Sequence, residues 1–173
     1  ITCGTLNIGN VSSGAITISA IISPANYETL DIQKGVTFTA TGGFASDVTS
    51  AAVYENMRVN GAVSINAAST LSATAIGGFV PAAADAFTII DNITASSTTG
   101  TFSGKPESTL VPIGGVNKYI SYFAGTGNDV VLGPPSANAN LINLTTTAGG
   151  LLPAFSRGPT SYTGKVCNNA TST

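Results

Sequence analysis

The chain has 173 residues, which suits one domain with or without a tail, but only six are Lys or Arg, eight are Asp or Glu, and none is histidine or tryptophan. Soluble domains usually carry about 25% charged residues, so this composition argues against acid–base catalysis, an activated nucleophile, a metal centre or a cofactor site. The formal net charge of −2 argues against nucleic-acid binding, and the most apolar stretch, residues 76–90, is interrupted by Gly and Pro, which argues against a membrane span.

The local pattern is all-β. Short segments rich in β-branched or aromatic residues, most of them alternating with polar residues, are separated by Gly-Asn, Ser-Ser-Gly, Gly-Gly and Asn-Gly turn signals. The segments expected as strands are 5–8, 15–22, 28–32, 36–40, 62–65, 70–75, 86–90, 119–123 and 129–132. Between them, residues 46–59 lack the apolar stripe of a helix.

Glycine-led units such as Gly61-Ala62-Val63-Ser64-Ile65 recur along the first half of the chain without a strict period. This favours a β-solenoid with coils of unequal length, in which each coil pairs with the next. A two-sheet β-sandwich explains the same short strands and is the alternative fold. We expect the β domain to cover residues 1–133.

The two cysteines, Cys3 and Cys167, lie near opposite ends of the chain. They are either unrelated thiols or a disulfide, which joins the ends of one chain or links neighbouring copies and requires an oxidising compartment. Closing so long a loop stabilises a fold by about 4–5 kcal/mol in the chain-entropy model.

The segments DAFTIIDN at 85–92, GTFSG at 100–104, YISY at 119–122 and GTGNDVVL at 125–132 follow one another in that order. This series resembles the end of the autotransporter-associated β-strand repeat region of bacterial surface proteins. The resemblance covers about the middle third of the chain. It implies a right-handed parallel β-helix that serves as an extracellular scaffold, although long regular repeats are missing on the N-terminal side.

Residues 134–140, which include Pro134, Pro135 and Ser136, are typical of a linker. The segments LINLTTTAG at 141–149, LPAF at 152–155 and TSYT at 160–163 then resemble the opening of the cadherin-like β-sandwich repeat of bacterial surface and secreted proteins. Only about a third of such a domain is present in 141–173, too little to bury its own apolar face. The side chains that need a partner surface are Leu141, Leu144, Leu152, Phe155, Tyr162 and Val166.

Three interpretations of this partial repeat stay open. It folds back onto the β domain of its own chain, it belongs to a domain that continues in a longer protein, or it adds a strand to a neighbouring copy and supplies main-chain hydrogen bonds there. Head-to-tail donation of that kind produces a filament unless the rotation closes a ring. The low charge fits donation, because proteins that stay monomeric usually protect exposed β-edges with charge.

Two weaker kinds of motif, a calcium-binding pattern and N-glycosylation patterns, also occur in the sequence. Residues 125–132 approximate one calcium-binding nonapeptide, but a single copy lacks the second turn that completes the coordination shell, which favours a turn in which Asn128 or Asp129 bonds its own backbone. N-glycosylation patterns begin at Asn10, Asn92, Asn143 and Asn169, a number that chance accounts for in a chain this rich in Asn, Ser and Thr.

The sequence therefore predicts a non-enzymatic structural subunit of an extracellular bacterial filament or surface layer, built by β-strand pairing between copies of itself. The alternative is an adhesin or autotransporter-like passenger stalk that binds a host or glycan ligand. The tyrosines would be the stacking platforms for sugars, but the absence of tryptophan favours packing roles for them.

Overall fold

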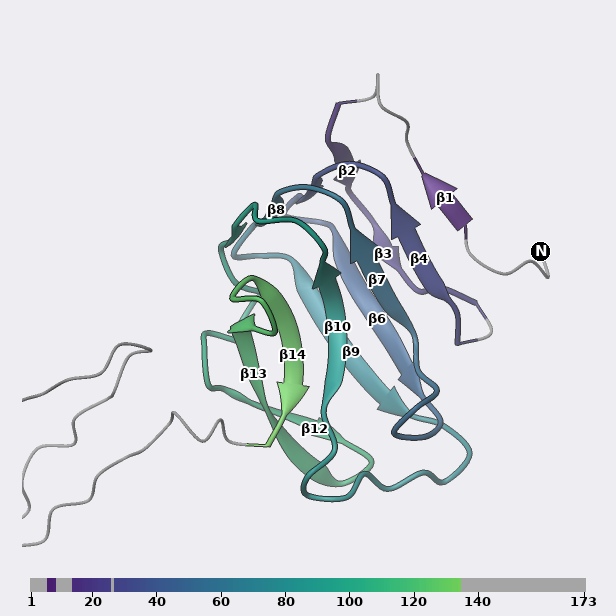
Figure 1. The fold of residues 1–173 in the computed structure, drawn as a ribbon. Helices are drawn as coiled ribbons and strands as arrows, with labels where there is room; N and C mark the ends of the chain where they lie inside the picture. The colour runs from purple at the N-terminus through teal and green to yellow at the C-terminus, as the bar shows by residue number, and fades with distance from the viewer. Residues whose placement is uncertain (1–5, 9–13, 26, 135–173) are drawn as a thin grey trace, which may run out of the picture. The chain divides into compact units, whose positions relative to one another are not determined.

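The computed structural model describes residues 6–8, 14–25 and 27–134. These residues form strands, turns and loops with no helix among them, so the prediction of an all-β fold is confirmed. The strands lie in three sheets (Figure 1).

The largest sheet has seven strands in the order β1 (Leu6–Ile8), β4 (Thr29–Ile32), β7 (Asn56–Val59), β10 (Phe87–Asn92), β14 (Asp129–Gly133), β13 (Val116–Ala124) and β12 (Leu110–Ile113). The second has four, in the order β11 (Thr98–Thr99), β8 (Val63–Ile65), β5 (Val36–Phe38) and β2 (Ile16–Ile18). The third has three, in the order β3 (Ile21–Ile22), β6 (Gly43–Val48) and β9 (Thr70–Ala75).

From β1 to β8, each strand pairs in parallel with the strand three places further along the chain, so the parallel series ends at β9, β10 and β11. Leu30 pairs with Met57, Val36 with Val63 and Gly43 with Thr70, so one offset of 27 residues relates partners in all three sheets. The other offsets are unequal, from 20 residues between Ile16 and Val36 to 35 between Val63 and Thr98. A fixed sequence period is therefore absent although the pairing itself is regular.

Two glycines, Gly35 and Gly61, allow the backbone segments that precede β5 and β8 to approach each other closely. A Cβ added to Gly61 would lie 2.5 Å from the backbone nitrogen of Gly35, and one added to Gly35 would lie 2.7 Å from the carbonyl oxygen of Ala62. Because no side chain fits there, the glycine-led units of the sequence mark places where backbone packs on backbone.

The seven-stranded sheet ends in an antiparallel meander. β14 pairs with β10, β13 with β14, and β12 with β13, all antiparallel, and Figure 1 shows β14 beside β10. The pairings of β14 with β10 and with β13 each contain an irregular step, at Thr88/Ile90 and at Ser121/Ala124. On this sheet the series of parallel strands therefore ends at β10, and the antiparallel meander follows it.

The core consists of alternate side chains stacked from strand to strand. In the four-stranded sheet Phe38 and Ile65 are buried neighbours, whereas Thr37 and Ser64 on the same strands face outward. Phe102 closes one end of this stack, since its ring centroid lies 5.4 Å from that of Phe38 in an edge-on contact. Fully burying an aliphatic or Phe side chain contributes about 1.5–3 kcal/mol, so these rows provide most of the driving force for folding.

The buried Lys118 of β13 joins the meander to the loop before β10. Its Nζ donates hydrogen bonds to the carbonyl oxygens of Ala82 at 2.6 Å, Ala83 at 3.1 Å and Asp85 at 2.9 Å. The Asp85 carboxylate in turn accepts the backbone N–H of Ala82 at 2.9 Å. These bonds fix the apolar loop 76–86, although Val80 at its tip remains exposed.

Several strand boundaries differ from those expected. Residues 15–22, expected as one strand, form β2 and β3 in different sheets because the chain turns at Ser19 and Ala20. The sequence prediction also missed β6, β7, β11 and β12. The expected linker beyond Pro134 and the partial repeat 141–173 lie outside the described residues.

Candidate functional site

None of the site residues predicted from the sequence can be placed. Cys3 and Cys167, and the apolar set Leu141, Leu144, Leu152, Phe155, Tyr162 and Val166, all lie outside the described residues. The disulfide and the donor segment therefore stay predictions. The structure instead reveals a sheet edge that pairs with no further strand among the described residues, and a cleft.

The free edge is formed by residues 15–23, which contain β2 and β3 and are called the N-proximal edge below. Within the described part of the chain, β2 pairs only with β5, and β3 pairs only with β6. The opposite side of each strand therefore presents backbone N–H and C=O groups that no described strand satisfies. Such a side can accept a further strand.

Some side chains at the N-proximal edge are less covered than their equivalents deeper in the sheets, although Ile18 is buried. Val36 and Val63, which stack in the row of Ile16, are 1% and 0% exposed, whereas Ile16 is only half-buried. Ile22 is likewise half-buried, and Ile21 is 62% exposed. The apolar core is thus incompletely covered at this end.

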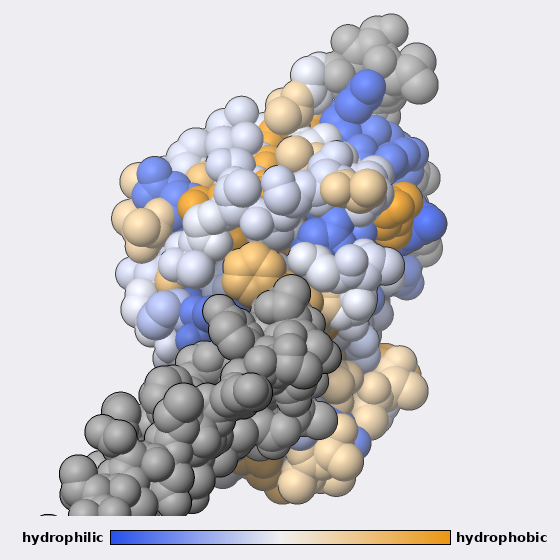
Figure 2. Space-filling view, turned by 60° about the vertical axis from the view of Figure 1, so that its left-hand side comes forward, coloured by the Kyte–Doolittle hydropathy of each residue, from blue (hydrophilic) through white to orange (hydrophobic). Residues whose placement is uncertain are grey.

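The N-proximal edge also lacks the residues that normally prevent strand addition. Residues 15–23 read AITISAIIS and contain no charged residue and no proline. Figure 2 shows pale colours, typical of Ser, Thr and Gly, over much of the visible surface, with blue and orange areas between them. Edge strands of monomeric proteins usually carry Lys, Pro or a bulge, so this edge is unprotected.

A cleft of about 630 Å³ lies between the loop after β10 and the turn between β13 and β14. Its lining residues are Asp91, Asn92, Ile93, Thr94, Ala95, Ser97, Thr126, Gly127 and Asn128. The sequence had singled out both segments, as an N-glycosylation pattern and as a calcium-like turn, but gave no indication that they meet.

Two asparagines hold the walls of this cleft. The buried Asn128 donates from Nδ2 to the carbonyl oxygens of Thr94 at 2.6 Å and Ser96 at 2.7 Å, and its Oδ1 accepts the Thr126 hydroxyl at 2.6 Å. Asn92 donates to the Ser96 carbonyl at 2.8 Å and accepts the N–H and hydroxyl of Thr94. Asn92 is therefore buried, and both its amide nitrogen and its amide oxygen are hydrogen-bonded in the folded protein.

Oxygen atoms of the calcium-like turn accept hydrogen bonds from residues 92–98. The Asp129 carboxylate accepts the backbone N–H of Asn92 at 2.9 Å, and the Thr98 hydroxyl donates to the Asn128 carbonyl. The side chains of Asn128 and Asp129 thus bond the backbone of residues 92–96 and not their own backbone, which differs from the self-bonded turn expected from the sequence. No group of three His, Cys, Asp or Glu residues that could hold a metal ion occurs in the described ranges.

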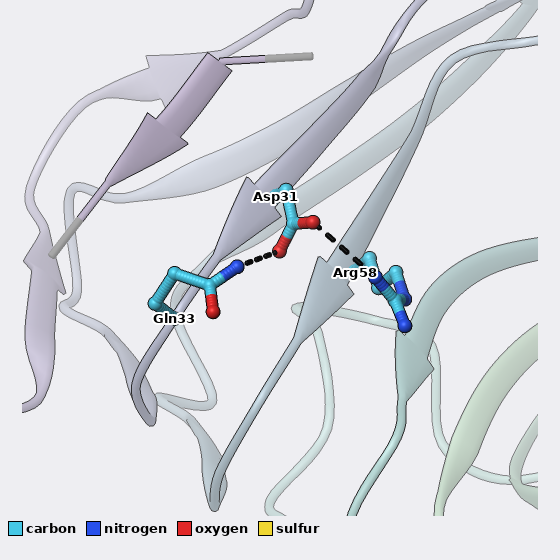
Figure 3. Close-up of polar contacts among 3 residues, drawn as sticks. All are labelled: Asp31, Gln33 and Arg58. Atoms are coloured by element: carbon cyan, nitrogen blue, oxygen red, sulfur yellow. Dashed lines mark hydrogen bonds and ion pairs between the residues drawn. The ribbon is translucent and has the colours of Figure 1, made fainter. Parts of the chain in front are cut away.

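A row of charged side chains crosses the largest sheet at one level. The register places Asp31 beside Arg58 and Arg58 beside Asp91. Arg58 Nη1 lies 3.3 Å from Asp31 Oδ2, and Gln33 Nε2 donates to Asp31 Oδ1 at 2.7 Å (Figure 3). Asp91 has its pKa raised above the ordinary 3.8, first by burial and then by the Asp129 carboxylate, while Arg58 opposes the rise.

A smaller cleft of about 330 Å³ adjoins the N-proximal edge and is lined by Ser23, Pro24, Ala25, Tyr27, Asp47 and Glu55. Glu55 Oε2 accepts the Ser23 hydroxyl at 2.8 Å and the Asp47 backbone N–H at 3.2 Å. The buried carboxylate thus ties the end of the N-proximal edge to β6, a structural role that the sequence did not reveal.

None of the protein-family models, curated proteins or solved structures compared with this chain matches it. The two family resemblances stay predictions. In the described residues, no helix is long and apolar enough to cross a membrane.

Proposed function

We propose that the protein is a non-enzymatic structural subunit of an extracellular bacterial filament or surface layer, which assembles through β-strand pairing between copies. The observation that carries this proposal is the N-proximal edge, an uncharged sheet edge with incompletely covered isoleucines. An exposed apolar edge without protecting charge is a liability for a monomer, but it is the feature that assembly by strand addition requires.

The proposed fold is a β-solenoid. Parallel pairing of each strand with the strand three places further on, repeated in three sheets, supports successive coils that stack on one another. In a sandwich of hairpins, neighbouring strands pair antiparallel, and here that pattern is confined to β10 and β12–β14. The irregular offsets agree with coils of unequal length.

The ionisable side chains of the described residues support a non-enzymatic role. Lys118 and Glu55 are buried and bonded to backbone groups, and Asp31 is paired with Arg58. Each therefore has a structural partner, and catalytic acid–base pairs need groups that converge on a substrate position.

The donor-strand part of this proposal is tested with single substitutions in the full chain. Leu144→Asp places a charge among the apolar residues that would enter a neighbour's sheet, whereas Thr145→Asp adds the same charge on the opposite face of a strand. We expect fibres of the wild type and of Thr145→Asp in negative-stain electron microscopy, and few or none of Leu144→Asp. Dispersed wild-type particles would rule out the filament.

The proposed disulfide is tested on non-reducing gels of the native protein. A Cys3–Cys167 bond within one chain gives a monomer band that migrates faster than the reduced form. A bond between copies gives a ladder that collapses on reduction, and unchanged migration with two free thiols would contradict both forms of the bond.

The cleft favours a second candidate, a surface module that binds a glycan. It offers the Asp91 carboxylate as a hydrogen-bond acceptor beside the exposed apolar side chain of Ile93. A glycan array compares the wild type with Asp91→Asn and with Asp47→Asn, which lies in the other cleft. A signal lost only in Asp91→Asn would support this role, and no signal from the wild type would reject it.

A further inference from the structure

We infer that the N-proximal edge is the acceptor surface for a β-strand of a second copy of this chain. This inference rests on the proposed function and deepens it, because it names the backbone groups through which copies would pair. Its support comes from backbone direction, side-chain exposure and charge.

The backbone direction of β2 follows from two hydrogen bonds. Ile16 N–H donates to the Gly35 carbonyl at 2.8 Å, and the Ile18 carbonyl accepts the Thr39 N–H at 2.9 Å. Both bonds point toward β5, and successive residues of a strand present their backbone groups to opposite sides. The N–H and C=O of Thr17 therefore point away from β5.

The same reasoning applies to β3. The Ala20 carbonyl accepts the Gly43 N–H at 3.2 Å, which directs Ala20 and, two residues later, Ile22 toward β6. The backbone groups of Ile21 then point away from β6. Thr17 and Ile21 thus direct backbone donors and acceptors toward the side of segment 15–23 on which no described strand pairs.

Apolar contacts would accompany these hydrogen bonds. Ile16 and Ile22 are half-buried although Val36 and Phe44, their neighbours in the next strands, are 1% and 0% exposed. A strand laid along the edge would cover them as β5 and β6 cover the following row. The added strand therefore completes the core as well as the hydrogen-bond ladder.

The partner is identified as a second copy by charge and sequence. The segment 15–23 is uncharged, free of proline and rich in isoleucine, which is the signature of segments that pair between identical chains. A formal net charge of −2 gives little repulsion between copies. At the far end of the largest sheet, the antiparallel meander occupies the side of β10 that a further parallel strand would need.

The test removes one outward-pointing donor without disturbing the sheet. Thr17→Pro deletes an N–H that points away from β5, and proline is tolerated on an edge strand in that orientation. Thr17→Val keeps the N–H and nearly the same shape, so it is the matched control. Sedimentation velocity over a range of concentrations measures association of the full chain, and far-UV circular dichroism checks that each variant is folded.

We expect Thr17→Pro to weaken self-association at least tenfold, while Thr17→Val associates like the wild type. Ile21→Lys, compared with Ile21→Leu, gives an independent answer if the proline variant does not fold. Association of Thr17→Pro and Ile21→Lys at wild-type strength would overturn the acceptor edge, but would leave the proposed function intact if Leu144→Asp still abolishes fibres. A wild type that stays monomeric would overturn both.

Hydrogen exchange provides a measurement without substitutions. Pairing with a second copy should slow exchange of the Thr17 and Ile21 amides as protein concentration rises, because both N–H groups become bonded. Concentration-independent protection would show that a segment of the same chain covers the edge, and would overturn the inference.

Discussion

Lys118 is a buried cation whose hydrogen bonds all end on backbone carbonyls of the loop 76–86. Lys118→Met keeps most of the apolar stem but leaves three carbonyls without their donor. Leaving a buried polar group unsatisfied costs about 1–3 kcal/mol, so we expect a loss of at least about 2 kcal/mol in urea unfolding. Lys105→Met makes the same change at a less buried position and should cost much less. Equal losses would contradict the role given to the three carbonyls.

Tyr122 links β13 to the segment around Phe102. Its hydroxyl accepts the Phe102 N–H at 3.0 Å and donates to the Lys105 carbonyl at 2.7 Å. Burial raises the pKa of Tyr122 from 10.0 to about 12, the Phe102 N–H acts against the rise, and Glu107 adds to it.

The pKa of Tyr122 predicts a loss of stability in alkali. Because the folded state holds the phenol proton more tightly, its stabilising effect is complete below pH 10 and disappears as the pH rises toward 12. Unfolding temperatures measured across this range should fall more steeply for the wild type than for Tyr122→Phe. Parallel pH profiles would show that Tyr122 does not contribute to the loss.

The raised pKa of Asp91 predicts a change of stability at the acidic end of the pH scale. The folded protein favours the protonated carboxyl, so this group's stabilising effect is complete below pH 3.8 and is lost as the pH rises through its folded pKa. Asp91→Asn should increase stability at pH 7 by less than about 1 kcal/mol, since a partly solvated group is screened. The gain should vanish below pH 3.8 in thermal unfolding scans. A destabilised variant at pH 7 would mean that Arg58 dominates.

Among the elements, the segment between β11 and β12 has a packing role that its irregular backbone conceals. Phe102 is buried between Phe38 and Tyr122, with centroid distances of 5.4 Å and 6.4 Å. Phe102→Ala should cost about 3–5 kcal/mol, the usual range for a buried aromatic ring. Phe123→Ala, at a side chain that is 66% exposed, is the matched control and should change the free energy of unfolding by less than about 0.5 kcal/mol.

The sequence predicts element type better than element boundaries. The alternation of Thr37 or Ser64 with apolar residues identified β5 and β8, because this pattern is local. The break between β2 and β3 was missed because AITISAII carries no Gly or Pro, and only its pairing with two different strands divides it. β12 was missed because it contains Pro112, which is tolerated in this last strand of the sheet.

The cleft could not be predicted for a related reason. Asn92 and Asn128 lie 36 positions apart, and their meeting at the Ser96 carbonyl depends on the antiparallel return of β14 beside β10. Composition and local pattern do not reveal such a long-range register, whereas each turn motif was recognisable by itself.

For the whole molecule, the low charge predicts how association responds to salt. If copies meet through an uncharged edge, the association constant should change less than about threefold between 0.05 M and 0.5 M sodium chloride, because there is little charge to screen. Sedimentation equilibrium at both concentrations checks this expectation. A steep fall with salt would mean that charged residues, such as those of the Asp31–Arg58 row, form the contact.

The antiparallel meander has a consequence for the order of folding. β13 and β14 are joined by a short turn, with Ala124 opposite Asp129, whereas the parallel partners Val63 and Thr98 are 35 residues apart. Short loops close faster than long ones, so we expect the meander to form first and the earlier strands to add to it, which pulse-labelled hydrogen exchange can follow. During synthesis the isoleucine-rich 15–23 segment leaves the ribosome well before the meander that starts folding. The nascent chain would therefore expose the aggregation-prone segment 15–23 until the meander has formed. A chaperone that binds this segment should raise the yield of soluble protein.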